Sequence, residues 1–159
     1  MTKEQGTIVH SKSSGIFACS KVRIYSSQEN SGKHSWQIHW TKGPKPTVGI
    51  LSKEDVKLIA SLKEMNIFGQ WVRLAYYWDS NNNFYINENG KETVLRSGLE
   101  AVKCGDWFQV QLKGNIITVN KKGGTHFDFV VKENVYYVPF IYATGKDCLC
   151  VIKPLKARE

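Results

Sequence analysis

The histidines are the first residues to weigh for chemistry, because histidine is the most common general base near neutral pH. The chain has four, which are His10, His34, His39 and His126. A hydrolytic triad also needs a nucleophile and an orienting carboxylate, and no Gly-x-Ser-x-Gly motif is present to supply the nucleophile. His34 and His39 are five residues apart in one predicted strand, so their side chains point to opposite faces. We therefore predict that the protein is not an enzyme.

The cysteines and glycines indicate neither a metal nor a cofactor. Cys19, Cys104, Cys148 and Cys150 lack the spacing of a disulfide framework or a zinc ribbon. Cys148 and Cys150 would place both thiols on one face of a strand, but two ligands do not complete a tetrahedral zinc site. The Gly-Lys pair at 32–33 lacks the upstream glycine of a phosphate-binding loop. We expect no cofactor, and reduced thiols in a cytoplasmic protein.

The tryptophans are candidates for recognition. Trp36 and Trp40 alternate with polar residues, which places them in the core, where one aromatic side chain can bury roughly 150–250 Å². Core or half-buried positions are also expected for the other three, Trp71, Trp78 and Trp107. The alternative is an exposed ring that stacks on a sugar or an RNA base. The only sugar-binding candidate is Trp78, beside the Asp-Ser-Asn-Asn-Asn turn at 79–83.

The charge pattern bears on the kind of partner. The 159 residues carry a formal net charge of +8. The lysines are scattered singly or in pairs, without a five-residue basic block. We attribute the charge to solubility and to protected strand edges; steering toward an acidic partner is the alternative, and nucleic acid is not the expected partner. No apolar run approaches the ~20 residues of a membrane helix, so no membrane partner is expected.

The elements that position these side chains are clearest at residues 104–124. The Gly-Asn pair at 114–115 predicts a two-residue hairpin turn of the primed type, because both positions tolerate positive φ. Pairing outward from the turn sets Leu112 opposite Ile117 and Val110 opposite Val119, all on one face. Polar residues fill the other face. One apolar and one polar side predict an antiparallel sheet that packs along one face only.

Strand patterns recur about every ten residues, as in a β-sandwich or barrel. A second hairpin is predicted around the Asn-Gly pair at 89–90. Its predicted cross-strand pairs are Glu88 with Lys91, Ile86 with Thr93, and Phe84 with Leu95.

One segment departs from the strand pattern. Ser52 is a predicted N-cap with the acidic Asp55 at the N3 position, and apolar residues follow at helical spacing. We predict one short helix over residues 53–65 that lies across one end of the sandwich and covers the core. The length of the chain fits a single domain over residues 1–159.

Five blocks match, in order and spacing, the motifs of one domain family. Residues 32–38 resemble its G-x-H-x-W-x-(I/V) strand, residues 48–50 its V-G-(V/I) block, and residues 77–85 its G-W-D…L-Y block. Residues 105–120 resemble the hairpin that opens with G-D, and residues 137–141 the Y-P-x-(V/I/F) strand.

Over about residues 8–153 the chain thus resembles a SPRY domain, the β-sandwich interaction module of many ubiquitin-ligase adaptors. The nearest variety is the SPRY domain of SOCS-box adaptors, whose tryptophan strand runs H-x-W-Q-I-x-W as residues 34–40 do. The chain departs from the pattern where Lys121, not glycine, follows Asn120. Nothing after Lys153 resembles a SOCS box and no RING or B-box cysteines occur, so no ubiquitin-ligase role is expected of this chain alone.

The resemblance implies an all-β, two-sheet antiparallel sandwich of the concanavalin-like jelly-roll kind, without catalytic activity. Its partner would be a protein or peptide, bound by loops at one rim of the sandwich. Carried over by position, the partner-binding residues are Lys12, Lys42, Gly43, Lys45, Pro46, Asn66, Phe68, Thr144, Gly145 and Lys146. Gly43 and Pro46 would limit the entropy of their loop, and the lysines would favour a peptide that contains Asp or Glu. A carbohydrate-binding lectin and an RNA-binding module are the two alternatives.

Overall fold

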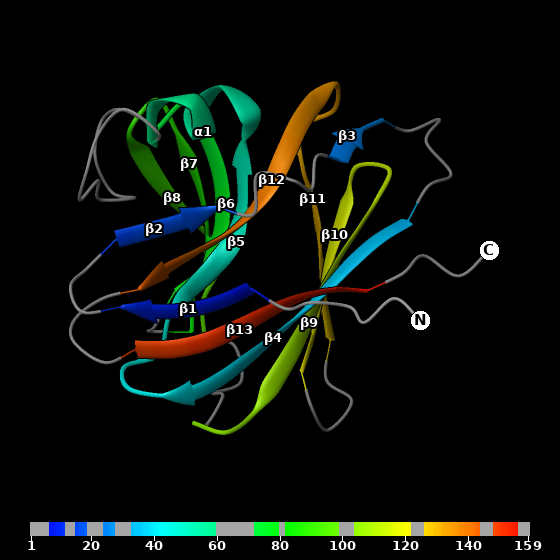
Figure 1. The fold of residues 1–159 in the computed structure, drawn as a ribbon. Helices are drawn as coiled ribbons and strands as arrows, with labels where there is room; N and C mark the ends of the chain where they lie inside the picture. Colours follow the sequence, from blue (N-terminus) through cyan, green and yellow to red (C-terminus); the bar gives the residue numbers. More distant parts are fainter. Residues whose placement is uncertain are drawn as a thin grey trace, which may run out of the picture.

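The computed structural model describes residues 7–11, 15–18, 24–27, 33–59, 72–79, 82–98, 104–121, 126–143 and 148–155. Two antiparallel sheets pack face to face (Figure 1), which confirms the predicted all-β sandwich. The six-stranded sheet has the order β1 (Thr7–Ser11), β13 (Cys148–Leu155), β4 (Lys33–Lys42), β9 (Trp107–Lys113), β10 (Ile116–Lys121) and β11 (His126–Val130). The seven-stranded sheet has the order β2 (Gly15–Ala18), β12 (Val135–Ala143), β5 (Thr47–Ser52), β6 (Leu74–Trp78), β7 (Phe84–Glu88) and β8 (Lys91–Arg96), with β3 (Ile24–Ser26) also beside β12.

The main core fills the space between the two sheets. Along β4, the side chains of Trp36, Ile38 and Trp40 are buried and those between them are half-buried, as strand alternation requires. Trp78 of β6 meets Phe108 of β9 edge to face, with ring centroids 5.5 Å apart. Because these two strands belong to different sheets, this contact joins the layers.

The tryptophans are packed as predicted wherever the structure describes them. Trp36, Trp40 and Trp78 are 2%, 9% and 1% exposed, and Trp107 is half-buried. Trp71 lies outside the described residues.

The β9–β10 hairpin has the predicted register. Leu112 pairs with Ile117, and Val110 pairs with Val119. The turn differs in one detail, because Gly114 has a φ of 59° whereas its neighbour in the turn has no positive φ. A positive φ at the first of the two turn residues only is the pattern of a type II′ turn. Glycine is therefore required at Gly114 but not at the next position.

The β7–β8 hairpin follows the prediction near its turn and departs from it further out. The confirmed pairs are Glu88 with Lys91 and Ile86 with Thr93. The predicted pairing of Phe84 with Leu95 is wrong, because the register shifts next to Phe84 and this residue pairs with Arg96. A β-bulge places one extra residue in β8. All six side chains of β8 are exposed, so its sequence has no buried alternation that would reveal the bulge.

A second, smaller core lies on the outer face of the seven-stranded sheet. Its buried members are Leu51, Val72, Ala75, Tyr77, Phe140 and Tyr142. All six residues of β5 are buried, so this strand is covered on both faces and not on one. Val56 of the helix α1 (Lys53–Ile59) packs against this cluster. In the described residues, no helix is long and apolar enough to cross a membrane.

The helix begins as predicted and is anchored by its cap. The Ser52 hydroxyl accepts a hydrogen bond from the Asp55 backbone N–H at 3.3 Å and donates one to the Asp55 carboxylate at 2.9 Å. The same carboxylate accepts the backbone N–H groups of Arg73 and Leu74, each at 3.0 Å, which ties the helix to the start of β6. The described helix ends at Ile59, and the rest of the predicted 53–65 span lies outside the described residues.

Candidate functional site

The predicted partner-binding residues belong to four loops, which contain Lys12, Lys42–Pro46, Asn66 with Phe68, and Thr144–Lys146. The strands that flank the first, second and fourth of these loops end on the same side of the sandwich. The cross-strand pairs at this end are Ser11–Cys148, Lys42–Leu149, Gly15–Ala143 and Thr47–Tyr142. The strands that bracket residues 12–14 and 144–147 therefore end beside the described connection at 43–46. In Figure 1 this is the end at which β4 passes into β5.

Most of the predicted site lies outside the described residues. These positions are Lys12, Asn66, Phe68, Thr144, Gly145 and Lys146. Residues 66 and 68 follow the helix α1 in the sequence. This helix begins after Ser52, which is at the opposite end of β5 from Thr47. The contribution of all these positions to binding remains a prediction.

The connection between β4 and β5 is held in one shape by its own residues. The indole N–H of Trp40 donates a hydrogen bond to the Gly43 carbonyl at 2.9 Å, and Gly43 has a φ of 83°. Lys42 and Gly43 are exposed, whereas Pro46 is buried. Pro46 therefore stiffens the loop from beneath, and Lys42, Gly43 and Pro44 form its accessible surface.

Lys45 is turned inward and not toward a partner. Its ammonium group donates hydrogen bonds to the Asp79 carbonyl at 3.1 Å and to the Asn82 amide oxygen at 2.7 Å. It also lies 4.1 Å from the centroid of the buried Trp78 ring. Burial lowers the pKa of Lys45 to about 8, although the charge of Asp79 opposes this shift. We expected this lysine to attract acidic peptides; instead, it connects two loops.

The turn between β6 and β7, which contains Asp79, Asn82 and Asn83, is the second loop at this end. The Asp79 carboxylate accepts the Asn83 backbone N–H at 3.1 Å, and Asn82 is left-handed with a φ of 63°. The side-chain oxygen of Asn83 accepts the Gly98 N–H at 3.3 Å. The Asp-Ser-Asn-Asn-Asn run indicates a turn, but no local signal shows that it lies against Lys45.

The turn at Cys104–Asp106 is the third loop at this end of the sandwich. The Gly105 N–H donates to the Trp40 carbonyl at 2.7 Å, and the Trp40 N–H donates to the Asp106 carbonyl at 3.2 Å. Cys104 and Gly105 are exposed. We call the described parts of these three loops, Lys42–Pro46, Asp79 with Asn82 and Asn83, and Cys104–Asp106, the loop rim.

The prediction that Trp78 is a candidate for sugar binding is wrong, because this residue is buried. Trp78 is 1% exposed, meets Phe108 edge to face and has the Lys45 ammonium over its ring, so the ring is not available to a sugar. The described residues hold no group of three or more potential metal ligands.

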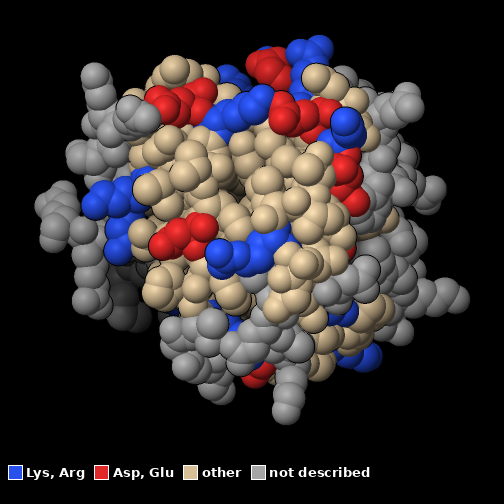
Figure 2. Space-filling model, turned by 180° about the vertical axis from the view of Figure 1, so that it is seen from behind, with Lys and Arg blue, Asp and Glu red and all other residues tan. Residues whose placement is uncertain are grey.

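Charge is mixed on the face of the molecule that Figure 2 shows. Acidic and basic side chains alternate around an uncharged centre, without a field of one sign. Among the pairs, the Lys132 ammonium, in the connection between β11 and β12, contacts the Glu88 carboxylate of β7, and both side chains are exposed. This distribution fits a general role of the charge in solubility.

The comparison with solved structures places the fold among known proteins. No protein-family model matches the sequence, and the comparison with curated proteins finds no match. Among solved structures, the SPRY domain of human HERC1 has a TM-score of 0.58 and 17% identity, over 95% of this chain and 90% of that one. The TRIM65 PSpry domain has a TM-score of 0.52 and 10% identity, over 89% and 71%. The carbohydrate-binding module CBM66 from Bacillus subtilis has a TM-score of 0.50 and 11% identity, over 95% and 90%.

These similarities extend over most of the chain, and two of the three structures are SPRY domains. The identities are too low to carry over a ligand, and the resemblance to the SOCS-box variety remains a prediction. The sheet order, the buried tryptophan strand and the structural matches together show that this chain has the β-sandwich fold of SPRY domains.

Proposed function

We propose that the chain is a non-enzymatic protein-interaction module that binds a short peptide or a partner surface at the loop rim. The observation that carries the proposal is the link made by Lys45, which bonds the β4–β5 connection to the turn at Asp79 and Asn82. A loop that is ordered before binding loses little conformational entropy when the partner arrives. Rigid sheets that hold such loops are a common basis for recognition.

The exposed cation of the loop rim is Lys42, since Lys45 is occupied within the protein. A peptide that contains Asp or Glu would gain mainly in association rate from this charge. Cys104 and Cys150 form no disulfide, and we expect the module to work in the cytoplasm, where thiols stay reduced.

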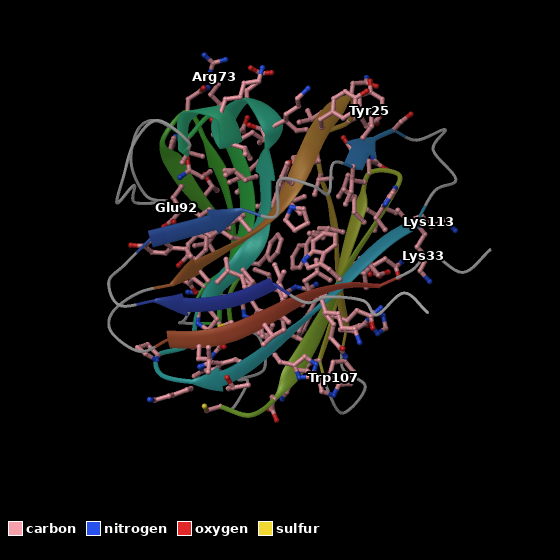
Figure 3. All side chains as sticks on the ribbon, in the orientation of Figure 1. Tyr25, Lys33, Arg73, Glu92, Trp107 and Lys113 are labelled. Atoms are coloured by element: carbon pink, nitrogen blue, oxygen red, sulfur yellow. The ribbon has the colours of Figure 1, made fainter. Side chains whose placement is uncertain are left out.

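A peptide-display screen followed by one matched pair of variants tests this proposal. Lys42→Glu should weaken binding of the enriched acidic peptides at least fivefold, because it reverses the charge on the binding surface. Lys113→Glu is the control, since Lys113 is also exposed but lies at the far end of β9, as Figure 3 shows. Equal effects of the two variants, or a screen that enriches no peptide, would reject the loop rim as the site.

Carbohydrate binding is the second candidate, and the outer face of the six-stranded sheet favours it. Half-buried Trp107 pairs with His39, and one cross-strand row beside them consists of Gln37, Gln109 and Asn120. Uncharged amides next to an aromatic ring suit the hydroxyl groups and the apolar face of a sugar. Figure 3 shows Trp107 near the start of β9, which is an inner strand of this sheet.

A glycan array with the Trp107→Ala variant tests this second candidate. We expect any glycan that binds this face to be lost in the variant, while Trp107→Phe, which keeps a stacking ring, retains part of the signal. An array without binders, or binders whose signal does not depend on Trp107, would exclude carbohydrate binding at this face. The peptide proposal would then be the remaining candidate.

A further inference from the structure

Two exposed tyrosines form an aromatic pair at the end of the sandwich away from the loop rim. Tyr25 of β3 and Tyr136 of β12 are 36% and 50% exposed, and their ring centroids are 4.7 Å apart with the planes tilted by 45°. Figure 3 shows Tyr25 beside the end of β12 at which this strand begins. Two large rings that share so much exposed surface are an unusual feature unless they serve recognition.

Buried hydrogen bonds hold the turn that precedes Tyr136. The hydroxyl of Ser26, a fully buried residue, donates to the Lys132 carbonyl at 2.7 Å and accepts the Val135 N–H at 3.2 Å. The Asn134 N–H donates to the Ser26 carbonyl at 2.5 Å, and Asn134 has a φ of 61°. A non-glycine residue in the left-handed region persists only where its surroundings determine it. The Asn134 side chain is thus placed, and its oxygen accepts the Tyr25 hydroxyl at 2.9 Å.

A shallow groove of about 460 Å³, lined by Tyr136 but not by Tyr25, lies between the start of α1 and the start of β12. Its lining residues are Ser52, Lys53, Glu54, Asn134, Val135 and Tyr136. Several of its acceptors are already engaged: the Ser52 hydroxyl bonds Asp55, the Glu54 carboxylate lies 3.5 Å from the Lys57 ammonium, and the Asn134 oxygen bonds Tyr25. The side-chain amide of Asn134 is a hydrogen-bond donor among the lining residues, which suits a ligand that offers acceptors.

We propose that this groove binds an extended, proline-rich segment of a protein partner, with an acidic residue beside the prolines. Proline carries a carbonyl acceptor but no backbone N–H, so it matches a surface that presents a donor next to aromatic rings. Polyproline segments are preformed and dock into aromatic-lined grooves. Lys53, whose ammonium lies 5.6 Å from the Tyr136 centroid, supplies the charge that complements the acidic residue. A sugar is less well matched, because it would need several acceptors as well as donors.

The test is an NMR titration of the labelled protein with a peptide of eight prolines followed by two aspartates. We expect saturable shifts at Tyr25, Tyr136 and the Asn134 side-chain amide, with a dissociation constant tighter than about 1 mM. Tyr136→Ala should weaken binding at least tenfold, as for an aromatic hot spot. Asn134→Asp keeps the acceptor for Tyr25 and tolerates the left-handed conformation, but it lacks the amide donor, and it should weaken binding at least fivefold.

The controls separate this groove from other surfaces. A Gly-Ser peptide of equal length that ends in two aspartates should cause no saturable shift, and Val130→Ala, at a 70% exposed residue of β11, should leave affinity unchanged. No saturable shift with the proline peptide would overturn the proposal. It would also be overturned by shifts at Lys42 and Gly43 in place of the tyrosines, or by the same tyrosines responding to cellobiose alone. The loop-rim proposal does not depend on any of these results.

Discussion

Lys45 shows how one side chain can connect two loops from within the protein. Its ammonium has replaced much of its hydration with the Asp79 carbonyl, the Asn82 amide oxygen and the face of Trp78. A cation over an aromatic ring gains more when it is desolvated, but the loss of water still disfavours the charged form. Burial lowers the pKa of Lys45 to about 8, and the charge of Asp79 opposes this shift.

The low pKa of Lys45 predicts a distinctive pH dependence of stability. Between about pH 8 and the unfolded pKa of 10.5, the unfolded chain holds a proton that the folded protein has released. The free energy of unfolding should therefore rise with pH across this window, relative to a Lys45→Met variant. Urea denaturation at pH 7.5 and pH 9.5 measures the difference between the two proteins.

Lys42→Met is the matched control, because Lys42 is exposed on the same loop. The difference in free energy of unfolding between Lys42→Met and the wild-type protein should be the same at both pH values. The corresponding difference for Lys45→Met should change with pH. Parallel pH profiles for the wild-type protein and Lys45→Met would show that Lys45 is as well solvated as Lys42.

At the scale of elements, the close approach of β5 to β6 explains a glycine in the V-G-(V/I) block. A Cβ added to Gly49 would collide with the Tyr76 carbonyl and lie 2.7 Å from the Tyr77 Cα. These are backbone atoms of the paired strand, so no side-chain rotation relieves the clash. Both strands are also buried on both faces, which leaves little freedom for them to move apart.

Gly49→Ala should consequently destabilise the fold by more than about 3 kcal/mol, at the upper end of overpacking effects. Thermal or chemical denaturation measures this loss. Gly98→Ala is the comparison, because a Cβ there meets nothing within 4 Å and only the φ of +68° opposes it. Its effect should stay near 1 kcal/mol. A Gly49→Ala protein as stable as the Gly98→Ala protein would show that β5 and β6 can separate at little cost.

At the scale of the whole molecule, the two ends of the sandwich present different kinds of side chain. The loop rim is polar and stiffened by Lys45, whereas the other end presents the Tyr25–Tyr136 pair. The face in Figure 2 mixes charges of both signs. Nucleic-acid binding depends on many cations that neutralise phosphates together, and this face does not provide them.

We therefore expect no measurable binding of a 20-nucleotide polyuridine to the protein at 150 mM salt, with any dissociation constant weaker than about 100 µM. Fluorescence anisotropy over a salt series measures this. Tight binding with a steep dependence on salt concentration would show that the net charge of +8 acts as one patch and would restore the RNA-binding alternative.

Alternation along strands and the preferences of turns determined, without any structure, the sandwich class, the β9–β10 register and the helix cap at Ser52. These features are local, because the direction of a side chain follows from the backbone next to it. Tertiary packing alone decided that Lys45 bonds to Asp79 and Asn82, that β5 is covered on both faces, and that Tyr25 meets Tyr136. Each of these depends on which segments, distant in the sequence, become neighbours when the two sheets close on each other, and no period within one strand encodes that choice.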